Sequence, residues 1–100
     1  MKINIQFVNI LTSESLKAYT TRKLMKLNKK YDSLINSEVF FKKENDSKGN
    51  GKICEIELSL TGPRLFASSK EKNYEIAVKN TVSDLEKQLN KRKGILKPYL

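Results

Sequence analysis

The spacing of hydrophobic residues along this 100-residue chain switches between two periods, and the order of the switches limits the fold more than any other feature. Near the N-terminus, Ile3, Ile5 and Phe7 alternate with polar residues, a pattern typical of a half-buried strand. After Thr12 and Ser13, both candidate helix caps, the spacing lengthens to three or four residues and predicts an amphipathic helix. The core positions expected on that helix are Leu16, Thr20, Leu24, Leu27 and Tyr31.

Two further strand-like runs then form a predicted β-hairpin. Residues 35–43 and 52–60 again alternate apolar with polar side chains, and the polar loop 44–51 joins them. The inward positions expected on the two strands are Ile35, Val39, Phe41, Cys54, Ile56, Leu58 and Leu60.

A turn, a short strand and a second helix complete the pattern. Gly62 and Pro63 mark the turn, and the strand is expected over 65–69. The last helix is expected from about Asn73 to Arg92, and Gly94 is a candidate for ending it. Its expected core side consists of Tyr74, Val78, Thr81, Val82, Leu85 and Leu89.

The order β-α-β-β-β-α predicts an α+β fold. Strands and helices alternate too little for a doubly wound sheet, so we expect a two-layer sandwich with a mainly antiparallel four-stranded sheet and both helices on one face. The length suits one domain with one modest core. We assign that domain to residues 1–93 and a short C-terminal tail to residues 94–100.

The net charge of the chain indicates which class of partner it binds. Twenty Lys and Arg against eleven Asp and Glu give a formal charge of +9, which favours a polyanion, with nucleic acid first and an anionic membrane surface second. The alternative is that the basic surface only serves solubility. The N-terminal apolar run is too short for a signal peptide, and no stretch approaches the roughly 20 apolar residues of a membrane span, so we expect a cytoplasmic protein.

The basic residues gather on the two helices. Projected at 100° per residue, the first helix carries its cations on one arc beside Tyr19 and has no acid after Glu14, although a solvated face usually mixes signs. On the second helix, cations lie on the outer side and accumulate after Leu89, where the acids stop. The candidate RNA-binding residues are Arg22, Lys23, Lys26, Lys29, Lys30, Lys79, Lys87, Lys91, Arg92 and Lys93.

The other face of the predicted sheet suits RNA poorly. Its expected outward residues include Glu38, Glu55 and Glu57, which would repel phosphate, with Phe40 and Phe66 as its aromatic residues. The helical side is therefore the expected contact surface.

No catalytic constellation appears in the sequence. The chain has no histidine and no glycine-rich phosphate loop, so we expect no enzyme activity, no catalytic residue and no cofactor. A single cysteine, Cys54, excludes an intrachain disulfide and a cysteine-rich metal site, and we expect it to act as a small buried hydrophobe.

Several segments in order carry a resemblance to a known family. They are the opening "KINIQFVNILTSESLKAYTTRKLMKLNKKY", the β-hairpin, and "FASSKEKNYEIAVKNTVSDLEKQLNKRK", with its small-residue step Ala67-Ser68 and Tyr74 at the helix start. Together they resemble the short form of the ribosome hibernation-promoting factors, also called ribosome-associated inhibitors. Thr20 stands where the resemblance leads us to expect an apolar residue.

The resemblance implies both a function and a partner. Such a protein binds the small ribosomal subunit near the decoding region, blocks the messenger and transfer RNA sites, and so inhibits translation in resting cells. The partner is ribosomal RNA first and ribosomal proteins second, with no membrane, and the protein is expected to be a monomer off the ribosome because it lacks the domain with which long family members pair ribosomes. By matching position, RNA contact is implied for Lys23, Lys26, Lys30, Lys87, Lys91 and Lys93.

Other functions remain as alternatives. The main one is a free-standing double-stranded RNA binder or RNA chaperone, and another is a small RNA-processing enzyme. A membrane-surface role is least expected, since the basic arc has no adjoining exposed apolar face.

Overall fold

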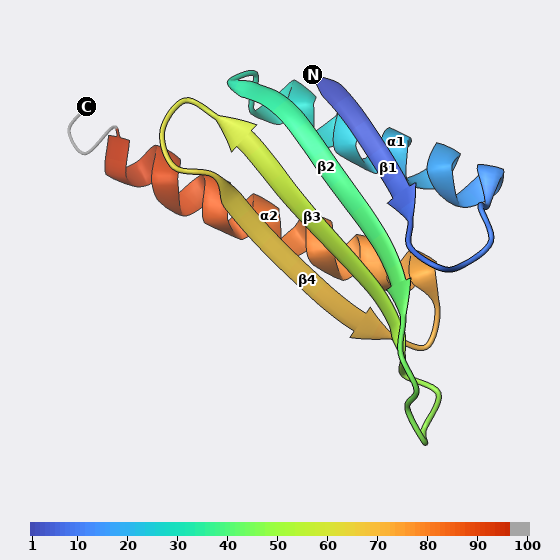
Figure 1. The fold of residues 1–100 in the computed structure, drawn as a ribbon. Coiled ribbons are helices and arrows are strands. Elements are labelled where there is room, and N and C mark those ends of the chain that lie inside the picture. Colours follow the sequence, from blue (N-terminus) through green and yellow to red (C-terminus); the bar gives the residue numbers. More distant parts are fainter. Residues whose placement is uncertain (97–100) are drawn as a thin grey trace.

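Four strands form one mixed sheet, and two helices cover one of its faces (Figure 1). The computed structural model describes the backbone of residues 1–96 and the side chains of residues 1–92. The elements in chain order are β1 (Lys2–Phe7), α1 (Glu14–Lys30), β2 (Leu34–Lys43), β3 (Lys52–Leu60), β4 (Leu65–Glu71) and α2 (Tyr74–Leu96). The predicted fold class is confirmed.

The sheet has the strand order β1-β2-β3-β4. β1 pairs with β2 in parallel, with Ile5 opposite Val39, while the β2–β3 and β3–β4 pairs are antiparallel. Parallel neighbours need a long crossover, and α1 supplies it. In Figure 1, α1 lies behind β1 and β2, and α2 lies behind β3 and β4.

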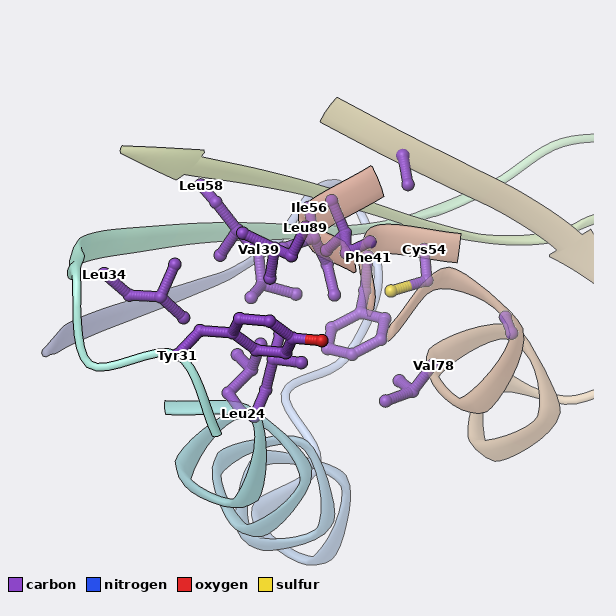
Figure 2. Packing of buried hydrophobic residues seen from close by; sticks show 14 of the residues in the cluster. Leu24, Tyr31, Leu34, Val39, Phe41, Cys54, Ile56, Leu58, Val78 and Leu89 are labelled. Carbon is purple, nitrogen blue, oxygen red and sulfur yellow. The ribbon is translucent and has the colours of Figure 1, made fainter. Parts of the chain in front are cut away.

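The core lies between the sheet and the helices. Figure 2 shows Leu24 and Tyr31 from the α1 side reaching towards Val39 and Phe41 of β2. The Phe41 ring stacks on Phe7 at 5.2 Å between centroids. The fully buried apolar side chains are Leu24, Val39, Phe41, Cys54, Ile56, Leu58, Ala77, Val78 and Leu85.

Two threonines occupy positions in this core. Thr20 is completely buried, and its hydroxyl donates to the carbonyl of Leu16 at 2.7 Å. Thr81 is also completely buried and donates to the carbonyl of Ala77 at 2.7 Å. Each hydroxyl finds its acceptor one turn back in its own helix, so neither position leaves an unsatisfied donor in the core.

Helix caps define where the two helices begin. Ser13 is the cap of α1, because its Oγ accepts from the amide of Leu16 at 3.2 Å. At α2, the Asn73 Oδ1 accepts from the amide of Ile76 at 2.8 Å. Short polar side chains favour such positions because they satisfy amides that lack a partner in the first turn.

Ile35 does not point inwards, contrary to the sequence prediction. The pairing of β2 with β3 shifts between Leu34 and Asn36, which leaves Ile35 as the extra residue of a bulge. Leu34 takes the inward position instead, and Ile35 is 55% exposed. A prediction from strict alternation assumes that every second residue points to the same face. The extra residue of a bulge breaks that alternation, so the residues before it point to the opposite face from the one predicted.

Gly94 does not end the last helix either. α2 continues to Leu96, so the glycine lies inside it. A glycine within a helix costs only about 1 kcal/mol relative to alanine, and the sequence has no proline between this glycine and Pro98 to force an end.

The β2–β3 loop is ordered by its own hydrogen bonds. Asp46 Oδ2 accepts from the amides of Asn50 at 2.7 Å and Lys48 at 3.2 Å. Gly51 is required at its position, since a Cβ there would lie 2.0 Å from the carbonyl oxygen of Glu44. In Figure 1 this loop projects beyond the ends of the strands, along the strand direction.

Candidate nucleic-acid interface

Five lysines line a groove between the two helices. The groove has a volume of about 500 Å³. Its lining residues are Lys23, Lys26, Leu27, Lys29 and Lys30 of α1, and Lys79, Val82, Ser83 and Glu86 of α2.

The spacing of these residues explains why they share the groove. Lys79, Ser83 and Glu86 follow each other at four and three residues, so they lie on one face of α2. Leu27, which is 3% exposed, and the partly buried Val82 belong to the packed stripes and form an apolar floor. The cations therefore surround an apolar strip that the core packing holds in place.

One carboxylate stands among the lysines of the groove. Glu86 forms an ion pair through its Oε2 with the ammonium of Lys30, which joins α2 to α1. The hydrogen bond from Lys30 to Glu86, followed by the negative charge of Glu86, raises the pKa of Lys30. The lysine end of the pair is exposed, so the pair itself contributes little to stability.

The four other groove lysines have no acidic partner. Among the described side chains, no ion pair is formed by Lys23, Lys26, Lys29 or Lys79. The one acid of α1, Glu14, lies at its start and pairs with Lys17 at 3.7 Å. Unpaired like charges repel one another, and an anion in the groove would relieve that repulsion.

Tyr19 supports the cations at the edge of the groove. The guanidinium of Arg22 and the ammonium of Lys23 each lie 5.5 Å from the centre of its ring. Such cation–π contacts hold long side chains near the surface without neutralising them. Arg22 is exposed but does not line the groove.

The predicted cations of the later part of α2 lie outside the groove. Lys87 and Lys91 are both exposed. Arg92 is half-buried, and its buried Nη1 has no hydrogen-bond partner among the described residues. The side chain of Lys93 lies outside the described residues. The candidate residues thus divide into a groove set and a second set farther along α2.

Sequence reasoning missed several members of the groove. It did not identify Ser83 and Glu86 as partners of the α1 cations, nor Leu27 and Val82 as a shared floor. The sequence predicts which residues share one face of each helix. It does not predict which faces of the two helices lie next to each other, because that depends on how both helices pack on the sheet. Tyr31 is a further link, because its hydroxyl donates to Asn90 of α2.

The open face of the sheet differs in charge from the helical side. Glu38 and Glu57 lie directly opposite each other on β2 and β3. Glu57 pairs with Arg64 and Glu55 pairs with Lys42, each at 2.9 Å. Phe40 is half-buried there and Phe66 is 54% exposed. The predicted outward placement of these residues is confirmed, and the face carries mixed rather than basic charge.

Neither a metal centre nor a membrane-spanning helix occurs in the described part of the chain. No group of three or more His, Cys, Asp or Glu side chains there could hold a metal ion. No described helix has the length and apolar character needed to cross a bilayer.

Two solved structures share the fold over nearly the whole chain. A ribosomal subunit interface protein from Coxiella burnetii is 24% identical with a TM-score of 0.81, over 94% of this chain and 99% of that one. The N-terminal domain of Protein Y from Thermus thermophilus is 21% identical with a TM-score of 0.78, over 91% of this chain and 98% of that domain.

At the level of sequence, no curated protein matches this chain. The model of one family, described as sigma 54 modulation protein / S30EA ribosomal protein, matches residues 3–97. Since the match covers almost every element of the fold, the chain belongs to the sigma 54 modulation protein / S30EA ribosomal protein family.

Proposed function

We propose that this chain is a ribosome hibernation factor that binds the small ribosomal subunit near the decoding region. There it blocks the messenger and transfer RNA sites and inhibits translation in resting cells. The observation that carries the proposal is the lysine-lined groove between α1 and α2, in a chain whose family is that of a ribosomal protein. The inhibition is steric and needs no chemistry, so the protein is not an enzyme and takes no cofactor.

The charge distribution supports contact through the helices. α1 carries six basic side chains and one acid, whereas the open face of the sheet carries Glu38, Glu55 and Glu57. A polyanion approaching this molecule is therefore attracted more strongly to the helical side than to the sheet, where the charges are mixed. Each lysine–phosphate contact releases condensed counterions, which makes binding favourable and dependent on salt.

The distribution of exposed apolar residues supports a monomer off the ribosome, and the proposed ribosomal partner places the protein in the cytoplasm. Among the described residues, the exposed large hydrophobic side chains are spread over the β1–α1 loop, α1, β2, β4 and α2. Such a scattered arrangement is not the contiguous apolar patch that marks a stable interface. The expected contacts are ribosomal RNA first and ribosomal proteins second. We assign these contacts to a domain of residues 1–93, a boundary that falls within α2, which runs to Leu96.

Sucrose-gradient sedimentation with isolated small subunits tests this proposal. The wild-type chain should travel with the subunits and should inhibit translation in a cell-free system. A variant with Lys26, Lys29 and Lys79 changed to Glu should do neither. The matched control changes three lysines outside the groove, Lys2, Lys48 and Lys72, to Glu and has the same net charge as that variant.

The alternative makes a different prediction in the same experiment. A free-standing double-stranded RNA binder or RNA chaperone would bind naked duplex as tightly as subunits and would leave translation unaffected. That result, or equal loss of binding in the groove variant and the control, would contradict the proposed function.

A further inference from the structure

The α1–α2 groove contains side chains that phosphate binding alone does not require. Phosphates need cations, and five lysines provide them. The floor, however, is apolar, formed by Leu27 and Val82, and one wall carries the carboxylate of Glu86. A carboxylate among phosphate-binding lysines would weaken the binding of a phosphate, so its presence points to a ligand with a donor group as well as a negative charge.

We propose that the groove holds one unpaired nucleotide of RNA. Its base lies on the Leu27–Val82 floor, the amine on the edge of the base donates to Glu86, and its phosphates lie against the lysines. The inference rests on the proposed function and specifies it, because it names the part of the RNA that this groove recognises. Single-stranded bases are read in this way, by contact with their face and hydrogen bonds on their edge.

The contacts of Glu86 suit this role. Lys30 binds its Oε2, and among the described residues no hydrogen bond reaches Oε1. The Glu86 side chain is 32% exposed, so it is partly enclosed yet accessible from the groove. The ion pair fixes the direction of the carboxylate and leaves one oxygen for a ligand. An ionised carboxylate only accepts hydrogen bonds, so it favours an amine over a carbonyl at the same position.

The size and charge of the site favour an RNA strand over a free nucleotide. A volume of about 500 Å³ lies within the range of small-ligand sites and has room for one base with its sugar. Cations continue beyond the groove at Lys87 and Lys91 of α2. A strand with several phosphates engages both sets, whereas a mononucleotide engages only one.

The proposal predicts a preference for cytosine over uracil. Cytosine presents an amine at the ring position where uracil presents a carbonyl, so the carboxylate accepts from the first and repels the second. A labelled oligocytidylate should bind about tenfold more tightly than an oligouridylate of equal length in fluorescence anisotropy, the effect of one hydrogen bond to a charged group. Equal binding of the two oligonucleotides would overturn the proposal.

The variant Glu86→Gln distinguishes recognition of the base edge by the carboxylate from a general effect of its negative charge. A glutamine amide both donates and accepts, so this variant should bind both oligonucleotides more tightly while its preference for cytosine falls to about twofold or less. If Glu86 acts only through its charge, both affinities rise equally and the preference stays, which would overturn the proposal. Glu75→Gln is the matched control, since Glu75 is exposed in the first turn of α2 outside the groove, and it should leave the preference unchanged.

Two further measurements show whether a negative result contradicts the nucleotide proposal or the proposed function. Cytidine monophosphate should compete weakly, and competition as strong as that of the oligonucleotide would assign the groove to a free nucleotide and overturn the proposal. Failure of the wild-type chain to sediment with small subunits would contradict the proposed function instead. Glu86→Gln should still sediment with them, because it removes no lysine.

Discussion

At the scale of single residues, Cys54 shows what burial does to a reactive group. The side chain is completely buried beneath α2, and the Thr81 hydroxyl of that helix lies 3.4 Å from the Cys54 carbonyl. Burial raises the pKa of the thiol to about 12, although the neighbouring Thr81 hydroxyl acts in the opposite direction. The thiolate is the nucleophilic form, so this cysteine is unreactive in the folded protein.

Alkylation at about pH 8, where a free thiol is partly ionised, tests whether Cys54 is unreactive in the folded protein. Iodoacetamide should leave the mass of the folded protein unchanged and should modify Cys54 fully in concentrated guanidinium chloride. The folded thiol holds its proton to a higher pH than the unfolded one, so its contribution to stability is complete below about pH 9 and is lost as the pH rises towards about 12. Rapid alkylation without denaturant would show that this part of the core opens.

At the scale of elements, the start of α1 depends on one side chain. The sequence offers Thr12 and Ser13 as caps, and the structure places the hydrogen bond on Ser13. Ser13→Ala should therefore destabilise the protein by about 1 kcal/mol, which lowers Tm by roughly 4–8 °C in a domain of this size. Thr12→Ala serves as the control and should shift Tm much less. Equal shifts in the two variants would mean that the cap is shared.

A second element-scale property concerns the charge of α1. Its cations share one side with few acids to pair with, so they repel each other. Tyr19 and the Lys30–Glu86 ion pair reduce that repulsion at two points. The helix keeps its fold because Leu16, Leu24 and other stripe residues are buried. The proposed RNA contacts and the packing that stabilises the fold thus lie on different faces of α1.

At the scale of the whole molecule, binding and folding should respond separately to charge. Lys26, Lys87 and Lys91 all lie outside the buried core, so changing the three to Glu should move the free energy of unfolding by no more than roughly 0.5 kcal/mol each. Binding to small subunits should be abolished. Charge-neutral changes at the same positions should instead flatten the dependence of log K on log salt by roughly 0.7–0.9 for each lysine–phosphate pair that is removed.

Thermal melting and sedimentation of this variant are measured together. Loss of sedimentation with an unchanged Tm supports RNA binding by both cation sets. Binding that persists at physiological salt would assign the interface to another face of the molecule. The Lys2, Lys48 and Lys72 control shows how much of any loss comes from net charge alone.

The sequence alone was sufficient for the order of elements and for the charged side of each helix. Both depend on short-range spacing: alternation places Cys54, Ile56 and Leu58 on one face of a strand, and a 3.6-residue period places Lys23, Lys26 and Lys30 on one side of α1. These periods come from backbone geometry and need no knowledge of distant residues. The family resemblance drew on the same ordered pattern.

Only the tertiary structure decided which residues meet. The groove exists because α1 and α2 pack side by side on the sheet, which brings Lys30 to Glu86 and Leu27 to Val82 from distant parts of the sequence. The bulge that exposes Ile35 likewise results from pairing with β3, not from any signal in β2 itself. Local periodicity sets the face that a side chain occupies, whereas its neighbours depend on how separate elements share one core.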